Sequence, residues 1–263
     1  MKKFIALLMA LSMMLLCACG NTPAESKPTA APTAIPTEAT TLPPETTEAP
    51  TEEPTEPAVA LHSGLREDGS FDEGTLFIGD SLTYGLVYSY LMANDLIGDA
   101  RYMAIVGAPI QYFFYSSVLN RDKYCIYSPE FEGMSYDQAV ASVGEEITAI
   151  YFMMGTNYSS DTNAQTYIEI VDYMMEHCPN ATIYLQLIPY ASSSAVQGDA
   201  VYWSIMEAYG HYAMEGIENV KLLDIKRAVG IHLTDDGVHL TYEGQENWYK
   251  ALVANAEDNN IPQ

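Results

Sequence analysis

The chain has 263 residues, of which 48% are hydrophobic and 17% are charged, and 35 acidic residues against 11 basic ones give it a net charge of −24. Residues 1–60 hold three lysines and seven glutamates, so a net charge of −20 falls on residues 61–263. A surface of this charge repels nucleic acid and anionic lipid headgroups, which excludes both as direct partners of the folded part.

Residues 1–19 have the pattern of an export signal. Lys2 and Lys3 are followed by an apolar core over residues 4–16 and then by small residues. This core is shorter than the ~20 apolar residues that a membrane-spanning helix needs. The last four residues, LCAC, resemble the cleavage site of a bacterial lipoprotein and predict a lipid on Cys19, with an ordinary secretory signal as the alternative. We therefore expect a protein outside the cytoplasm, anchored to the bacterial cell membrane through Cys19 alone.

Residues 20–60 consist mainly of proline, threonine, alanine and glutamate. They offer almost no apolar surface to bury, so we predict a disordered and extended tether. In polyproline geometry, at about 3.1 Å per residue, the tether would reach on the order of 100 Å from the membrane. The remainder, residues 61–263, is long enough for one domain with a substantial core.

Apolar runs alternate with helical patterns through this domain. Strands are predicted over residues 76–78, 102–106, 147–153, 182–187 and 220–225. Helices are predicted over residues 82–94, 135–143, 163–177, 199–214 and 242–255. Runs such as AIYFMM are apolar on both faces, which is typical of a parallel sheet covered on both sides. The alternation predicts a three-layer α/β/α sandwich around a mainly five-stranded parallel sheet.

The residues that follow the predicted strands include several that carry chemistry. The segments are Gly79-Asp80-Ser81, Gly107-Ala108-Pro109, Gly155-Thr156-Asn157 and the loop from Asp235 to His239. Ligands of an open parallel sheet bind at the carboxyl ends of its strands, so these segments should meet at one edge. Helix capping would explain Asp80 or Ser81 alone, whereas a catalytic centre explains all four segments.

Taken together, these segments resemble the motif blocks of the SGNH hydrolases, also called the GDSL esterase/lipase family. The blocks are Gly79-Asp80-Ser81-Leu82, Gly107, Gly155-x-Asn157 and Asp236-x-x-His239, in the order of the family. The resemblance extends over about residues 75–252. It implies the flavodoxin-like fold of that family and the activity of a serine esterase. One departure is Tyr158, which stands where many relatives have an aspartate.

The resemblance also implies a role for each motif residue. Ser81 would be the nucleophile, His239 the general base and Asp236 the acid that orients the imidazole, with the adjacent Asp235 as the alternative acid. A serine hydroxyl needs such a base because it is a poor nucleophile until its proton is taken. The oxyanion hole would be formed by the N–H groups of Ser81 and Gly107 and by the side-chain amide of Asn157.

Clues to the substrate come from aromatic residues near the same strand ends. Tyr84, Tyr158 and Tyr190 are candidate substrate-binding residues because aromatic faces with hydroxyl rims suit sugars, although half-buried core positions are the alternative. We expect the substrate to be a short acyl ester, above all an acetyl ester, of a small molecule or glycan. No cluster of residues has the ligand spacing of a zinc or calcium site, so we predict no metal and no cofactor.

Two other functions stay possible at this point, and so does a disulfide bond between two cysteines. The same triad would also serve a sugar O-acyltransferase, and the scaffold would suit a glycan-binding module without catalysis. Cys125 and Cys178 would be able to pair outside the cytoplasm, but sequence does not fix the distance between them, and a buried thiol at Cys178 is the alternative.

Overall fold

The computed structural model of the chain describes residues 61–115, 125–189 and 198–259. The predicted export signal with Cys19, the predicted tether over residues 20–60 and the candidate Tyr190 lie outside the described residues. No helix in the described part of the chain is both long enough and apolar enough to cross a bilayer.

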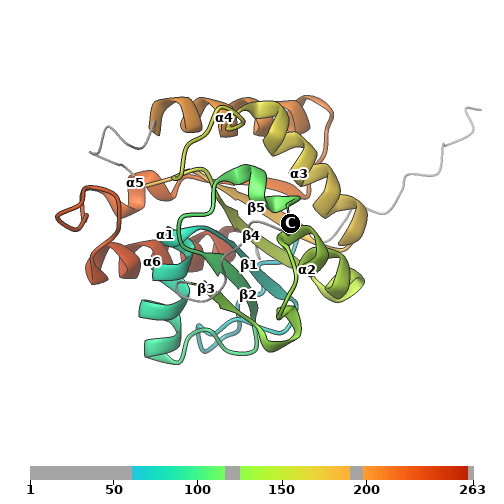
Figure 1. Ribbon diagram of the computed structural model, residues 1–263. Helices are drawn as coiled ribbons and strands as arrows, with labels where there is room; N and C mark the ends of the chain where they lie inside the picture. The colour runs from blue at the N-terminus through green and yellow to red at the C-terminus, as the bar shows by residue number, and fades with distance from the viewer. Residues whose placement is uncertain (1–60, 116–124, 190–197, 260–263) are drawn as a thin grey trace, which may run out of the picture. The chain divides into compact units, whose positions relative to one another are not determined.

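Six strands form one sheet in the order β3-β2-β1-β4-β5-β6 (Figure 1). Their bounds are Thr75–Gly79 for β1, Arg101–Ile105 for β2, Cys125–Tyr127 for β3, Ala149–Met153 for β4, Thr182–Gln186 for β5 and Val220–Leu223 for β6. Five of them pair in parallel, and β3 pairs antiparallel with β2 at the edge. The predicted fold class is thereby confirmed, with β3 as an additional strand. This strand escaped prediction because it has only three residues, all half-buried.

The helices connect these strands. Their bounds are Ser81–Tyr84 for α1, Tyr136–Val143 for α2, Ala164–His177 for α3, Gly198–Met214 for α4, Ile225–Val229 for α5 and Tyr242–Asn259 for α6. α1 continues into a π-helix over Gly85–Leu91 and a 3₁₀ turn over Met92–Asn94, so the helix expected over residues 82–94 is irregular inside. Further 3₁₀ turns cover Ile110–Phe113, Pro129–Phe131 and Gly144–Glu146. α5 is too short to produce a periodic pattern.

Two groups of helices sandwich the sheet. α2, α3 and α4 pack side by side on one face, whereas α5, α6 and the π-helix that continues α1 pack together on the other (Figure 1). Between them, Phe77, Tyr151 and Tyr184 lie in register on β1, β4 and β5, and their rings stack with centroids 5.1 and 4.8 Å apart. This row of buried aromatic rings fixes the central strands side by side.

The order in which the chain adds strands to the sheet places a crevice at the carboxyl ends of β1 and β4. From β1 the chain moves to β2 on one side, and from β4 it moves to β5 and β6 on the other, so the two neighbouring strands form the switch point where ligands of such sheets bind. A Cβ atom at Gly79 would lie 2.4 Å from the carbonyl oxygen of Met153, so only glycine permits this close approach. The Tyr136 hydroxyl donates to the Gly79 carbonyl at 2.7 Å and holds the end of β1.

Candidate active site

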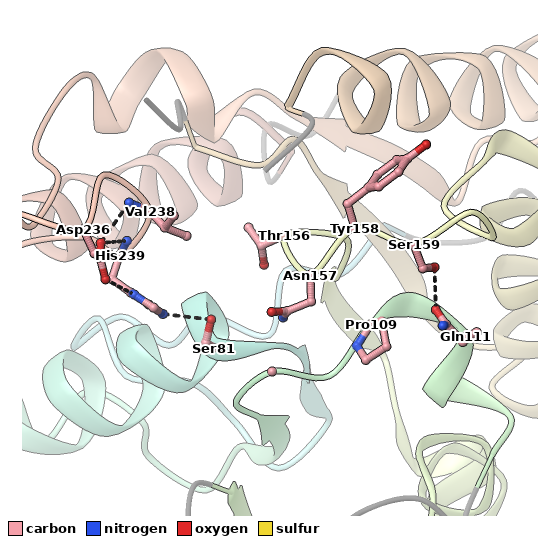
Figure 2. A pocket seen from close by; sticks show the side chains of 11 residues that line it. Ser81, Pro109, Gln111, Thr156, Asn157, Tyr158, Ser159, Asp236, Val238 and His239 are labelled. Atoms are coloured by element: carbon pink, nitrogen blue, oxygen red, sulfur yellow. Dashed lines mark hydrogen bonds and ion pairs between the residues drawn. The ribbon is translucent and has the colours of Figure 1, made fainter. Parts of the chain in front are cut away.

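Ser81 is the first residue of α1 and lies at the carboxyl end of β1. The preceding residue, Asp80, caps the helix because its Oδ1 accepts from the backbone N–H of Leu82 at 3.1 Å. The capping role that sequence assigned to either Asp80 or Ser81 therefore belongs to Asp80. The side chain of Ser81, which does not cap, points instead toward His239 (Figure 2).

His239 contacts both of the other predicted triad residues. Its Nε2 lies 3.0 Å from the Ser81 Oγ, although the two residues are 158 positions apart in the chain. Its Nδ1 lies 2.6 Å from Oδ2 of Asp236 (Figure 2). The structure thus brings the predicted nucleophile, base and acid into one continuous chain of hydrogen bonds.

Asp236 owes its position to a tight turn. Its Oδ1 accepts from the Thr234 hydroxyl at 2.8 Å and from the backbone N–H groups of Val238 and His239 at 2.9 and 3.0 Å. The bond to the imidazole, with these others, holds the pKa of the Asp236 carboxyl well below its usual range. The carboxylate on the imidazole is therefore that of Asp236, while Asp235 is exposed beside it.

The three predicted oxyanion donors line one pocket. Its volume is about 590 Å³, and its described lining residues are Ser81, Gly107, Pro109, Gln111, Thr156, Asn157, Tyr158, Ser159, Asp236, Val238 and His239. Gly107 follows β2 with φ at +79°, a conformation that favours glycine. The Asn157 side chain points from the loop after β4 toward Ser81 (Figure 2), and one of its amide N–H bonds donates to the Ala108 carbonyl at 3.2 Å.

Asp80 connects the loop after β1 with the loop after β4. The side chain is fully buried, and its Oδ2 accepts from the backbone N–H of Thr156 at 3.1 Å and from the Thr156 hydroxyl. Burial raises the pKa of Asp80, and these hydrogen bonds act against that rise. Because Asp80 precedes Ser81 and Thr156 precedes Asn157, the contact fixes the predicted nucleophile relative to a predicted oxyanion donor.

The three candidate tyrosines have different positions. Tyr158 lines the pocket, but its ring points away from Ser81 (Figure 2). Tyr84 is not among the described residues that line the pocket, and its ring packs on Tyr88 with centroids 5.4 Å apart. Tyr190 lies outside the described residues. Of the three, only Tyr158 therefore borders the described pocket.

Five lining residues received no predicted role from the sequence, although three of them belong to the segments that follow the predicted strands. They are Pro109, Gln111, Thr156, Ser159 and Val238. Each stands within four positions of a predicted oxyanion or triad residue, so the loops that carry the motifs were the available signal. Their side chains differ too much in chemistry for a sequence pattern to predict that they line the pocket.

The described part of the chain also bears on metal binding and on the pairing of two cysteines. Within residues 61–115, 125–189 and 198–259, no three His, Cys, Asp or Glu side chains come together as a metal site would require. Cys125 and Cys178 do not form a disulfide with each other. Cys178 is a buried thiol, and burial raises its pKa to about 12.

The fold of this chain is similar to the folds of several proteins of known structure. No family model and no curated protein matches the sequence. A family two carbohydrate esterase from Clostridium thermocellum, solved in complex with cellohexaose, has 17% identity and a TM-score of 0.51, and the match covers 70% of this chain but only 63% of that one. A member of the lipolytic protein G-D-S-L family from Veillonella parvula has 18% identity, coverages of 68% and 96% and a TM-score of 0.46. A carbohydrate esterase family 3 protein from Talaromyces cellulolyticus has 18% identity, coverages of 70% and 98% and a TM-score of 0.43. The likeness to the family two carbohydrate esterase, with its TM-score of 0.51, shows that this chain shares the three-layer α/β/α fold of that protein.

Proposed function

We propose that this protein is a carboxylic ester hydrolase in which Ser81, His239 and Asp236 act as a catalytic triad. The observation that carries the proposal is the hydrogen-bond chain from Asp236 through the imidazole to the Ser81 hydroxyl, with distances of 2.6 and 3.0 Å. These three hydrogen-bonded residues lie at the switch point of the sheet and line a pocket. Such an arrangement suits a serine nucleophile that is activated by a neighbouring base.

The first half of the reaction transfers the acyl group to the enzyme. His239 Nε2 takes the Ser81 proton while Oγ attacks the ester carbonyl carbon, and the C–O bond to the alcohol breaks as the imidazolium returns that proton to the leaving oxygen. The ionised Asp236 keeps Nδ1 protonated and stabilises the imidazolium. In the second half, water replaces the alcohol, and His239 takes its proton while the water oxygen attacks the acyl carbon. The bond from the acyl carbon to Oγ of Ser81 then breaks as the imidazolium returns the proton to Oγ, which releases the acid and restores the enzyme.

The tetrahedral intermediates carry a negative oxygen that needs donors. The backbone N–H groups of Ser81 and Gly107 are two candidates at the pocket. A primary amide has two N–H bonds, so Asn157 retains a second donor besides the one bonded to the Ala108 carbonyl. Donors held in place before the reaction stabilise the developing charge without having to reorganise.

We further propose that the substrates are short acyl esters of carbohydrates outside the cytoplasm. The pocket is lined mainly by small and polar residues, and the domain's negative charge favours neutral substrates. The neighbour from Clostridium thermocellum, a carbohydrate esterase bound to cellohexaose, supports this substrate class on a similar fold. The predicted export signal and the predicted lipid on Cys19 support the location.

A fluorophosphonate probe, which reacts with activated serines, tests the proposal. Labelling of the wild type at Ser81, and none in a folded Ser81→Ala variant, is the expected result. Ser204→Ala is a matched control, because that hydroxyl donates to the Ala200 carbonyl within α4, and it should label normally. Labelling that persists in Ser81→Ala would contradict the proposal. Product analysis with an added acceptor sugar then separates hydrolysis from acyl transfer.

A further inference from the structure

The pocket has a second polar wall, at a distance from His239. Figure 2 shows the triad at one end of the pocket and Gln111, Ser159, Pro109 and Tyr158 at the other, with Asn157 between the two ends. In the mechanism proposed above, none of these four residues takes part in the chemistry. They are therefore available to contact the part of the substrate that does not react.

Hydrogen bonds fix the orientation of the Gln111 side chain. The Ser159 hydroxyl donates to Oε1 of Gln111 at 2.7 Å. That hydroxyl oxygen itself accepts from the backbone N–H of Asp161 at 3.3 Å, and its contact with the Thr162 hydroxyl is longer, at 3.5 Å, than its bond to Gln111. With Oε1 engaged by Ser159, the carboxamide presents its NH₂ group, which has two donors and no acceptor.

The same wall is joined firmly to the oxyanion region. Gln111 belongs to the 3₁₀ turn after β2, whereas Ser159 belongs to the loop after β4, so their hydrogen bond connects two loops on either side of β1. The bond from Asn157 to the Ala108 carbonyl connects the same two loops. A group held by two such bonds keeps a fixed position relative to the reacting carbonyl, as a specificity subsite requires.

We propose that Gln111 binds the alcohol part of the substrate, and that its N–H groups donate to a hydroxyl or ether oxygen of a neutral, hydroxylated alcohol such as a sugar. The proposal rests on the ester hydrolase function proposed above. The ring faces of Pro109 and Tyr158 provide the apolar contacts that a sugar ring needs.

The composition of the wall disfavours other alcohols. The described lining residues include no lysine or arginine, and their only carboxylate is that of Asp236, so an anionic alcohol would find no opposite charge. An alkyl chain laid against Gln111 would cover its N–H donors without offering an acceptor, which weakens binding. A neutral polyol satisfies the donors and meets no like charge.

The test compares two acetyl esters, a monoacetylated methyl glucoside and phenyl acetate. The alcohol part of phenyl acetate has no hydroxyl or ether oxygen besides the esterified one. Gln111→Ala should lower the ratio of kcat/KM for the sugar ester to that for phenyl acetate by about three- to tenfold, mainly through KM, because one neutral hydrogen bond is lost. Gln165→Ala, a substitution of an exposed glutamine on α3, is the matched control and should leave the ratio unchanged. An unchanged ratio in folded Gln111→Ala would overturn the proposal.

Two further measurements complete this test, one for the case that Gln111→Ala does not fold and one that does not depend on turnover. Ser159→Ala leaves Gln111 in place but releases its amide, so a smaller fall in the same ratio is expected even if Gln111→Ala does not fold. Calorimetric titration of methyl glucoside into Ser81→Ala measures binding without turnover, and adding Gln111→Ala should weaken that binding by a similar factor. If the wild type hydrolyses neither ester, the function proposal fails, whereas equal binding in both titrations would refute the role of Gln111.

Discussion

Replacing Asn157 with alanine should produce two separate losses, because its amide is expected to make two different contacts. The bond from Nδ2 to the Ala108 carbonyl, 3.2 Å long and partly buried, supports the folded state. Its loss should lower the free energy of unfolding by about 0.5–1.5 kcal/mol. The second N–H is the proposed donor to the oxyanion, and losing such a donor lowers kcat by about 10²–10³, equivalent to roughly 2.7–4 kcal/mol of transition-state stabilisation.

The control for this prediction is Asn163→Ala. Asn163 caps α3 by accepting from the Thr166 backbone N–H at 3.2 Å, so its replacement should cost about 1 kcal/mol of stability without lowering kcat. Urea unfolding followed by circular dichroism gives the stabilities, and steady-state hydrolysis of phenyl acetate gives kcat and KM. If Asn157→Ala lowers kcat no more than Asn163→Ala does, the assignment of Asn157 to the oxyanion is wrong.

Three other variants test the remaining contacts. Asp236→Asn should lower kcat by about 10³–10⁴, because the amide no longer holds the imidazole in the required tautomer, and a kcat within tenfold of wild type would count against the triad. Asp80→Ala removes the acceptor of three buried hydrogen bonds and should lower the free energy of unfolding by about 2–4 kcal/mol. Burial raises the pKa of Asp80 above its ordinary 3.8, so its contribution to stability is present below that pH and lost as pH rises through the raised value. The stability difference between wild type and Asp80→Ala should therefore shrink as the pH rises above about 4, and a difference that grows would refute this. Tyr136→Phe should cost about 1 kcal/mol, since the buried Gly79 carbonyl loses its donor, and an unchanged urea midpoint would show that this contact does not stabilise the fold.

The regular part of the fold could be predicted because its signals are local. β4 and α3 are long enough for their apolar patterns to be recognised, and Asn163 at the start of α3 is a typical helix cap. β3 and α5 gave no such signal. β3 is a three-residue edge strand that exists through its pairing with β2, and α5 has only five residues. Segments of this length depend on tertiary contacts that a sequence pattern does not contain.

Within the site, the order of the motif blocks was sufficient to predict that Ser81 and His239 lie close together, because parallel strands end at the same edge of the sheet. The spacing of the last motif block favoured Asp236 over Asp235, but the physical reason for this preference is not visible in the sequence, since adjacent carboxylates differ only in where the turn directs them. The turn is fixed by bonds from Asp236 to the backbone N–H groups of Val238 and His239. Gln111 was missed for a related reason, because its position depends on Ser159, 48 residues away on another loop.

The proposed function requires that Ser81 forms a covalent acyl intermediate with the help of His239. Mass spectrometry of the protein quenched shortly after mixing with phenyl acetate tests this claim directly. We expect the mass of one acetyl group on the peptide that contains Ser81, and none in His239→Ala quenched at the same time. Hydrolysis that proceeds while Ser81 stays unmodified, or an acetyl group that accumulates on another residue instead, would contradict the account.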